Sequence, residues 1–197
     1  MAKGYLVLED GTVFEGELFG AECETSGEVV FTTGMCGYQE SLTDPSFKGQ
    51  ILVMTYPLIG NYGVADEYYQ SRSIHVRGLV VREYCREPSP MYGGRTIDDF
   101  LKTFGIPGIS GIDTRELVIK IRTGGTVKGA ITSDAEGIED LVKKLRGMPA
   151  PSESNLVGEV SCKEISRNDN GKEITVGLID CGTKSGIIRD LNARFNV

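Results

Sequence analysis

Short apolar runs separated by turn residues dominate the first half of the chain. Residues 5–8 and 13–18 flank the tetrapeptide Glu9-Asp10-Gly11-Thr12. An Asp-Gly pair between two such runs predicts a β-hairpin, because glycine readily adopts the positive φ that a tight turn needs. Further strands are predicted at residues 28–33, 51–55 and 78–82. The run at 51–55 (ILVMT) is apolar almost throughout, which is typical of a strand buried on both faces.

Helical patterns begin after residue 95. Thr96 precedes two acidic residues and an apolar side, so it is expected to cap a helix that Gly105 ends. Asp113 with Glu116 three residues later resembles a capping box, and it opens a second helix that stops at Gly124-Gly125. The glycine-rich stretch 105–108 matches no phosphate-binding fingerprint, so we expect it to form a turn.

A third helix follows a predicted strand at residues 127–132. Ser133-Asp134 is expected to cap it. Its apolar residues have the spacing i, i+3, i+4, i+7 that places them on one face, at Ile138, Leu141, Val142 and Leu145. Strands followed by alternating strands and helices indicate a mixed α/β (α+β) domain whose sheets are covered by helices.

The character of the chain changes near residue 150. The stretch 147–155 (GMPAPSESN) is rich in proline and serine and is typical of a linker. A buried strand at 174–180, a turn at 181–184 and a helix at 185–194 would make the first half of a βαβ unit. We therefore divide the chain into a first domain (1–150), a linker (151–173) and the start of a second domain (174–197).

Charge and composition exclude several classes of function. The net charge is −7, which disfavours general nucleic-acid binding because phosphate groups need clustered lysine and arginine. No stretch reaches the ~18 apolar residues of a membrane span, and the N-terminus is not a signal peptide, so we expect a cytoplasmic protein. The five cysteines lie far apart and there is one histidine, which predicts reduced thiols and no metal site.

Candidate chemistry is sparse. Asp44-Pro45-Ser46 predicts a tight turn, in which Pro45 fixes φ and Ser46 has a hydroxyl and a backbone N–H to offer to a ligand. Arg115 lies at a helix start, where its charge opposes the helix dipole, so it is expected to have a specific acidic partner. Cys36 and His75 are the one cysteine and histidine pair that we consider as a nucleophile and its base, although no sequence motif joins them.

Several motifs taken together resemble one family. Residues 32–47 (TTGMCGYQESLTDPSF), 55–63 (TYPLIGNYG), 78–82 (GLVVR) and 108–115 (GISGIDTR) are similar to the small subunit of glutamine-dependent carbamoyl phosphate synthase. The tail 180–184 (DCGTK), with Ile187-Ile188-Arg189, is similar to the opening of that family's glutaminase domain. The resemblance runs from residue 5 to the end of the chain.

The resemblance implies a fold and a function. The fold is a three-layer β/β/α N-terminal domain, followed by the first strand and helix of a flavodoxin-like class I glutamine amidotransferase domain. The family hydrolyses glutamine and passes ammonia to a large subunit, which makes carbamoyl phosphate from bicarbonate and ATP for arginine and pyrimidine synthesis. The implied partners are that large subunit and glutamine. ATP and magnesium belong to the large subunit, so no cofactor is expected in this chain.

The resemblance also implies roles for single residues. Ser46 is expected to contact glutamine bound at the glutaminase site. Structural or interface support is assigned to Asp44, Pro45, Tyr56, Asn61, Asp113 and Arg115.

The chain departs from the family's pattern in its catalytic residues. The family's Gly-x-Cys-x-Gly-His-Gln elbow does not occur in residues 1–197, nor do the catalytic histidine and glutamate, and Cys181 does not match the nucleophile. Ser185-Gly186 replaces the expected Arg-Asn. We therefore expect residues 1–197 alone to release no glutamate from glutamine. Two alternatives stay open: a free-standing docking module without chemistry, and an unrelated hydrolase that uses Cys36 and His75.

Overall fold

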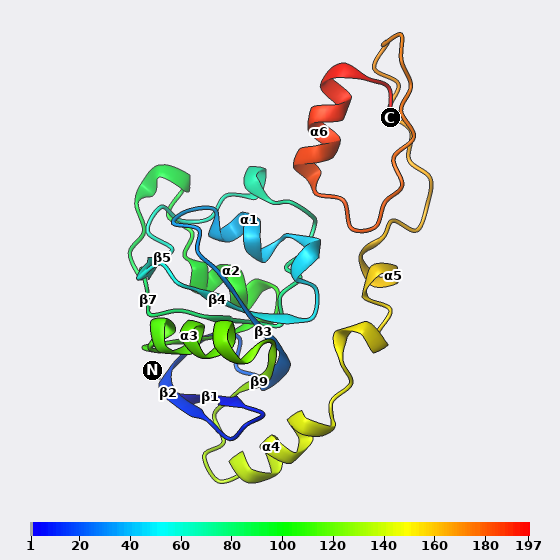
Figure 1. The fold of residues 1–197 in the computed structure, drawn as a ribbon. Helices are drawn as coiled ribbons and strands as arrows, with labels where there is room; N and C mark the ends of the chain where they lie inside the picture. The colour runs from blue at the N-terminus through cyan, green and yellow to red at the C-terminus, as the bar shows by residue number, and fades with distance from the viewer. Residues whose placement is uncertain (1) are drawn as a thin grey trace.

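The computed structural model describes residues 2–197 and is built around a β-barrel (Figure 1). Within these residues, seven strands close on themselves in the order β1-β2-β8-β6-β4-β3-β9. Their bounds are β1 (Lys3–Leu8), β2 (Val13–Gly20), β3 (Thr25–Thr32), β4 (Gln50–Met54), β6 (Gly78–Val80), β8 (Pro107–Ser110) and β9 (Val127–Thr132).

The predicted hairpin is confirmed. Strands β1 and β2 pair antiparallel with Val7 opposite Val13. The turn between them uses Gly11 at φ 93°, and the N–H of Thr12 donates to Oδ1 of Asp10 at 2.9 Å. The other predicted strands of the first 132 residues are present too, each within a few residues of the expected bounds.

Strand β9 closes the barrel because it pairs on both sides. Its register sets Ile131 opposite Leu6 of β1 and opposite Thr25 of β3. The resemblance implies a three-layer β/β/α domain; the structure shows a closed barrel in which β9 joins β1 to β3. The broader expectation of a mixed α+β fold is confirmed.

Strands β3, β4, β6 and β8 run parallel to one another, whereas β1–β2, β1–β9, β2–β8 and β3–β9 pair antiparallel. Two short strands, β5 (Leu58–Ile59) and β7 (Glu83–Tyr84), follow β4 and β6 and pair parallel with each other. The carboxyl ends of β4, β6 and β8 therefore meet at one edge of the barrel.

Strand β4 is buried on both faces, as its apolar run predicts. Ile51 and Val53 pack in a cluster with the barrel residue Leu6 and with Leu117 of α3. Leu52 and Met54 point the other way and pack with side chains of α1 and α2. Helices α1 and α2 thus cover the outer face of β4.

Helices surround the barrel and continue past it. They are α1 (Tyr38–Leu42), α2 (Ile97–Thr103), α3 (Thr114–Gly124), α4 (Ile138–Gly147), α5 (Leu156–Val160) and α6 (Ser185–Arg194). The predicted caps of α2 and α3 are confirmed, since Thr96 accepts from the N–H of Asp99 and Asp113 accepts from that of Glu116. Within residues 2–197 no helix is both long and apolar enough to cross a bilayer.

Two local predictions are wrong. The cap of α4 is Gly137 rather than Ser133-Asp134; Asp134 instead accepts from the N–H groups of Glu136 and Gly137 and so shapes the preceding turn. The stretch 105–108 is only partly a turn, because β8 begins at Pro107 and pairs with β2 and β6. Pro107 fits there because it is the first residue of the strand.

The C-terminal segment (residues 161–197) extends beyond the barrel, with α5 between the two (Figure 1). Its helix α6 has the predicted bounds. The buried strand predicted at 174–180 is wrong: these residues are mostly exposed and form only an isolated bridge, Thr175 to Asn196. A strand needs a neighbour along its length for its backbone groups, and among the described residues only Asn196 pairs with this stretch.

The buried position of β4 generates a prediction about stability. Leu52 is 0% exposed, so Leu52→Ala should lower the free energy of unfolding by about 2–5 kcal/mol through lost burial and a cavity. Urea denaturation of the variant measures this. Ile119→Ala is the control, because Ile119 of α3 is 55% exposed and should cost much less. Equal losses in both variants would contradict the core described above.

Candidate functional site

The Asp44 turn (residues 44–46) lies between α1 and β4. Asp44 caps a short 3-10 helix, η1 (Pro45–Phe47), and its Oδ1 accepts from the backbone N–H of Ser46 at 2.9 Å and from Ser46 Oγ at 2.7 Å. Asp44 is 9% exposed, whereas Ser46 is exposed. The buried carboxylate therefore holds an exposed serine in one orientation.

Lys184 of the C-terminal segment reaches the same carboxylate. Its Nζ lies 3.1 Å from Oδ2 of Asp44, and their side chains are 42% and 12% exposed. Burial opposes ionisation of Asp44, but the hydrogen bonds from Ser46 and the contact with Lys184 outweigh it. The pKa of Asp44 is consequently below its ordinary value.

A second tight turn places Lys184 there. Asp180 Oδ1 accepts from the N–H groups of Gly182 at 2.9 Å and Thr183 at 2.7 Å, and its Oδ2 accepts from the N–H of Cys162. The Thr183 bond is the largest cause that lowers the pKa of Asp180, to about 2. A Cβ on Gly182 would lie 3.1 Å from Cβ of Pro45. The two turns therefore touch.

The other predicted support residues lie elsewhere. Tyr56 and Asn61 follow β4, and Asp113 and Arg115 follow β8, so both pairs leave the carboxyl edge of the parallel strands. The Asp44 turn precedes β4, whose five residues span roughly 17 Å. The structure thus brings Asp44, Pro45 and Ser46 together and separates them from Tyr56, Asn61, Asp113 and Arg115.

Residues at the carboxyl edge are exposed. Tyr56 is 38% exposed, and Asn61 and Arg115 are exposed as well. Asp113 caps α3 with a bond of 2.9 Å to the N–H of Glu116. Within residues 2–197 the structure gives Arg115 no ion pair. A specific partner for Arg115 stays a prediction.

Cys36 and His75 do not contact each other in the described part of the chain. His75 Nε2 lies 2.8 Å from Ser71 Oγ, and its Nδ1 is buried without a hydrogen-bond partner among these residues. Burial, followed by the positive charge of Lys48, lowers the pKa of His75. Cys36 is exposed. The structure therefore provides no geometry for a Cys36–His75 nucleophile pair.

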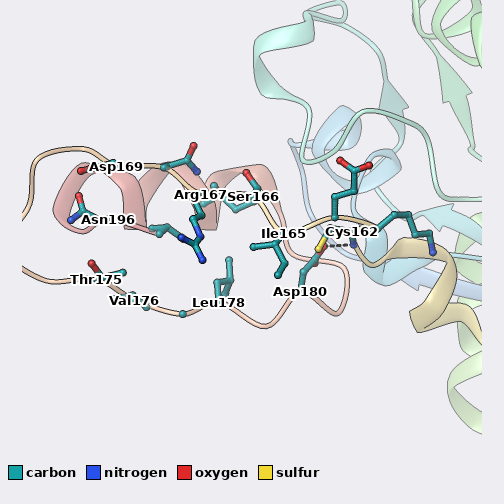
Figure 2. A pocket seen from close by; sticks show the side chains of 16 residues that line it. Cys162, Ile165, Ser166, Arg167, Asp169, Thr175, Val176, Leu178, Asp180 and Asn196 are labelled. Atoms are coloured by element: carbon teal, nitrogen blue, oxygen red, sulfur yellow. Dashed lines mark hydrogen bonds between the residues drawn. The ribbon is translucent and has the colours of Figure 1, made fainter.

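A large cavity of about 740 Å³ lies within the C-terminal segment, away from the Asp44 turn. Figure 2 shows its lining, which includes Ile165 and Leu178, with the bond between Cys162 and Asp180 at one end. Ile165 is 90% exposed and Ile179 is 88% exposed. No catalytic constellation converges there. Among the described residues, no group of three or more His, Cys, Asp or Glu is placed to hold a metal ion.

Sequence reasoning did not assign a role to Lys184 or to Gln70. Lys184 lies inside the motif DCGTK, which indicates a turn but gives its side chain no role. Gln70 lies in a polar loop after η2 (Asp66–Tyr68) and carries no motif. Its backbone N–H donates to Oγ1 of Thr43 at 2.9 Å, next to the Asp44 turn. Only the fold brings it there.

Comparison with known families decides the identity of the chain. The family model described as carbamoyl-phosphate synthase small chain, CPSase domain, matches residues 6–131, which include all seven barrel strands in whole or part among the described residues. The chain belongs to this family. The resemblance found in the sequence is thereby confirmed.

Relatives in this family cover nearly the whole chain. The carbamoyl phosphate synthase small chain of Archaeoglobus fulgidus is 48% identical over 192 residues, which is 98% of this chain and 54% of that protein. The pyrimidine-specific small chain of Bacillus subtilis is 48% identical, covering 98% and 52%. The small chain of Bacillus caldolyticus is 50% identical, with the same coverage. The chain spans about half the length of these relatives.

The contact between Asp44 and Lys184 yields a prediction that a double-mutant cycle tests. Asp44→Asn and Lys184→Met, alone and combined, should give a coupling free energy of about 0.2–1 kcal/mol at pH 7 in urea unfolding, since the pair is partly exposed. The pKa of Asp44 is lowered on folding, so this contribution is present above about pH 4 and is lost as the pH falls further.

The exposed pair Lys3–Glu15 provides the matched control. Its side chains are 58% and 62% exposed, so its coupling should be smaller. A coupling of zero between Asp44 and Lys184 at pH 7 would show that the contact does not join the two turns in solution.

Proposed function

We propose that this chain is part of the small chain of glutamine-hydrolysing carbamoyl phosphate synthase, and that it docks on the large subunit and presents Ser46 to glutamine. The observation that carries the proposal is the Asp44 turn, in which a buried carboxylate orients exposed Ser46. Lys184, from the segment that resembles the start of a glutaminase domain, binds the same carboxylate. Ser46 therefore lies where the two parts of the chain meet.

The arrangement suits recognition of an α-amino acid. The N–H of Ser46 is already donated to Asp44, so the group offered to the ligand is the hydroxyl oxygen. An oxygen fixed in advance loses little conformational entropy when a ligand binds. Pro45 restricts the backbone, and the two bonds to Asp44 restrict Ser46. In the proposed reaction Ser46 contacts the substrate without taking part in bond breaking.

The chemistry itself belongs to residues that this stretch of sequence does not contain. The resemblance implies attack of a cysteine thiolate on the glutamine amide, a histidine base and backbone N–H groups that stabilise the oxyanion. Ammonia would then reach the large subunit, which uses ATP and magnesium. We assign residues 1–150 to docking and residues 174–197 to the start of the glutaminase domain, with 151–173 as the linker.

A second candidate function is a docking module without chemistry. The closed barrel supports it, because the barrel has its own buried core, formed largely without the C-terminal segment. The two candidates differ in the role of Ser46, which would be a substrate contact in the first and only part of a turn in the second.

Ser46→Ala distinguishes them. In a small chain that includes the glutaminase domain, the variant should lower kcat/KM for glutamine by roughly five- to tenfold, the equivalent of one hydrogen bond of about 1 kcal/mol. Synthesis from ammonia should be nearly unchanged, because Ser46 would contact glutamine only. Steady-state rates with each nitrogen source measure this. Equal losses of rate with both nitrogen sources would mean that Ser46 has only a structural role in its turn.

Docking is tested by calorimetric titration of the 197-residue chain, shown to be folded by circular dichroism, against a purified large subunit from the same source. We expect saturable one-to-one binding. Tyr56→Ala and Arg115→Ala should each weaken it by about tenfold if the exposed carboxyl edge is the interface. Ser46→Ala is the control and should bind as tightly as the unaltered chain. Absence of binding, by this chain and by a longer one that includes the glutaminase domain, would refute the proposed partner.

A further inference from the structure

Helix α6 begins without an acceptor of its own. The first N–H groups of a helix lack partners within the helix and are usually satisfied by a side-chain oxygen of the capping residue. The capping residue here is Lys184, which makes no side-chain cap bond, and α6 is ten residues long. Its first N–H groups therefore depend on acceptors from elsewhere in the chain.

Gln70 supplies those acceptors from the barrel side. The N–H of Ser185 donates to the backbone oxygen of Gln70 at 2.7 Å. The N–H of Gly186 donates to the side-chain Oε1 of Gln70 at 3.3 Å. The distance in sequence between Gln70 and Gly186 is 116 residues, so a residue of the first domain caps the first helix of the C-terminal segment.

The same short stretch also holds the residue before the Asp44 turn. The backbone N–H of Gln70 donates to Oγ1 of Thr43 at 2.9 Å, and Ser71 Oγ donates to the backbone oxygen of Thr43 at 2.7 Å. Thr43 is 0% exposed, and its Oγ1 donates in turn to the backbone oxygen of Gln39 at 2.8 Å. Thr43, immediately before Asp44, is therefore hydrogen-bonded both to residues 70–71 and to Gln39.

From these contacts we infer that Gln70 is a positioning residue for the glutamine contact. It binds the start of α6 through its side chain and backbone oxygen, and it binds Thr43 through its N–H. This sets the turn that carries Lys184 at a fixed place relative to the turn that carries Ser46. The effect of Gln70 on the glutamine contact rests on the proposed function, whereas the capping of α6 follows from the contacts alone.

The chemistry of the side chain explains why an amide or acid is needed at this position. Only Oε1 of Gln70 reaches Gly186, so an acceptor oxygen at the end of a side chain of this length is required. Glutamate keeps that oxygen and adds a negative charge, which a helix N-terminus favours. Methionine has a similar length but lacks the oxygen. Gln70→Met and Gln70→Glu therefore separate loss of the acceptor from a change in size.

The first experiment measures amide hydrogen exchange by NMR in the 197-residue chain. Gln70→Met should speed exchange of the Gly186 N–H by about three- to tenfold, the effect of one hydrogen bond, and Gln70→Glu should restore slow exchange. Thr96→Val is the matched control, because it removes the cap of α2 and should leave Gly186 unaffected. Unchanged exchange of Gly186 in Gln70→Met would overturn the capping.

The second experiment uses a small chain that includes the glutaminase domain, assembled with the large subunit. Gln70→Met should raise KM for glutamine by about three- to tenfold, with ammonia-dependent synthesis unchanged, and Gln70→Glu should recover the KM. An unaltered KM in Gln70→Met, in an assembly that uses glutamine normally, would overturn the positioning role alone. Failure of the unaltered assembly to use glutamine would instead overturn the proposed function, and the exchange result would be unaffected.

Discussion

Burial of β4 on both faces constrains the positions of the candidate residues around it. Leu52 and Met54 pack under α1 and α2 while Ile51 and Val53 pack inside the barrel, so the strand cannot shift its register without exposing one of these sets. Its amino end carries the Asp44 turn, and its carboxyl end leads to Tyr56. A rigid strand thereby sets the proposed glutamine contact, Ser46, and an exposed edge at opposite ends of β4.

The Asp44 carboxylate organises the amino-end side. It is nearly buried, and an ionised carboxylate is tolerated there because Ser46 and Lys184 satisfy both of its oxygens. Those partners come from the two parts of the chain that the proposed function requires to act together. Because one oxygen binds Ser46 and the other binds Lys184, a movement of the second turn would be transmitted to the serine through a single side chain. Asp44 therefore joins the two turns in addition to shaping its own.

Much of the barrel could be predicted from sequence because its signals are local. The Asp10-Gly11 hairpin, the Thr96 and Asp113 caps and the apolar face of α4 all depend on residues within a few positions of one another. Strand β8 was missed because Pro107 and Gly108 indicate a turn, and only pairing with β2 and β6 makes them a strand. Closure by β9 is likewise a contact between distant segments, which periodicity does not encode.

The candidate site shows the same difference between residues with local sequence signals and residues placed by distant contacts. The shape of the Asp44 turn follows from three consecutive residues and was predictable, whereas the grouping of Tyr56, Asn61, Asp113 and Arg115 at another edge follows from strand order. Gln70 has no local signal at all, since its role depends on Gly186 far along the chain. Residues that join two parts of a fold are the ones that sequence patterns are least able to find.

The C-terminal segment shows how local and non-local bonds differ in what they require. The turn at 180–184 is formed by Asp180 and the backbone beside it, so it exists although the preceding residues make no strand. The stretch 174–180 forms no strand, and its isoleucines Ile174 and Ile179 are exposed. The turn at 180–184 and the cap of α6 contact the barrel side of the chain through Pro45, Asp44 and Gln70. On this basis the contact between the two parts of the chain does not depend on a strand at 174–180, because each bond that makes it comes from a turn or a helix end.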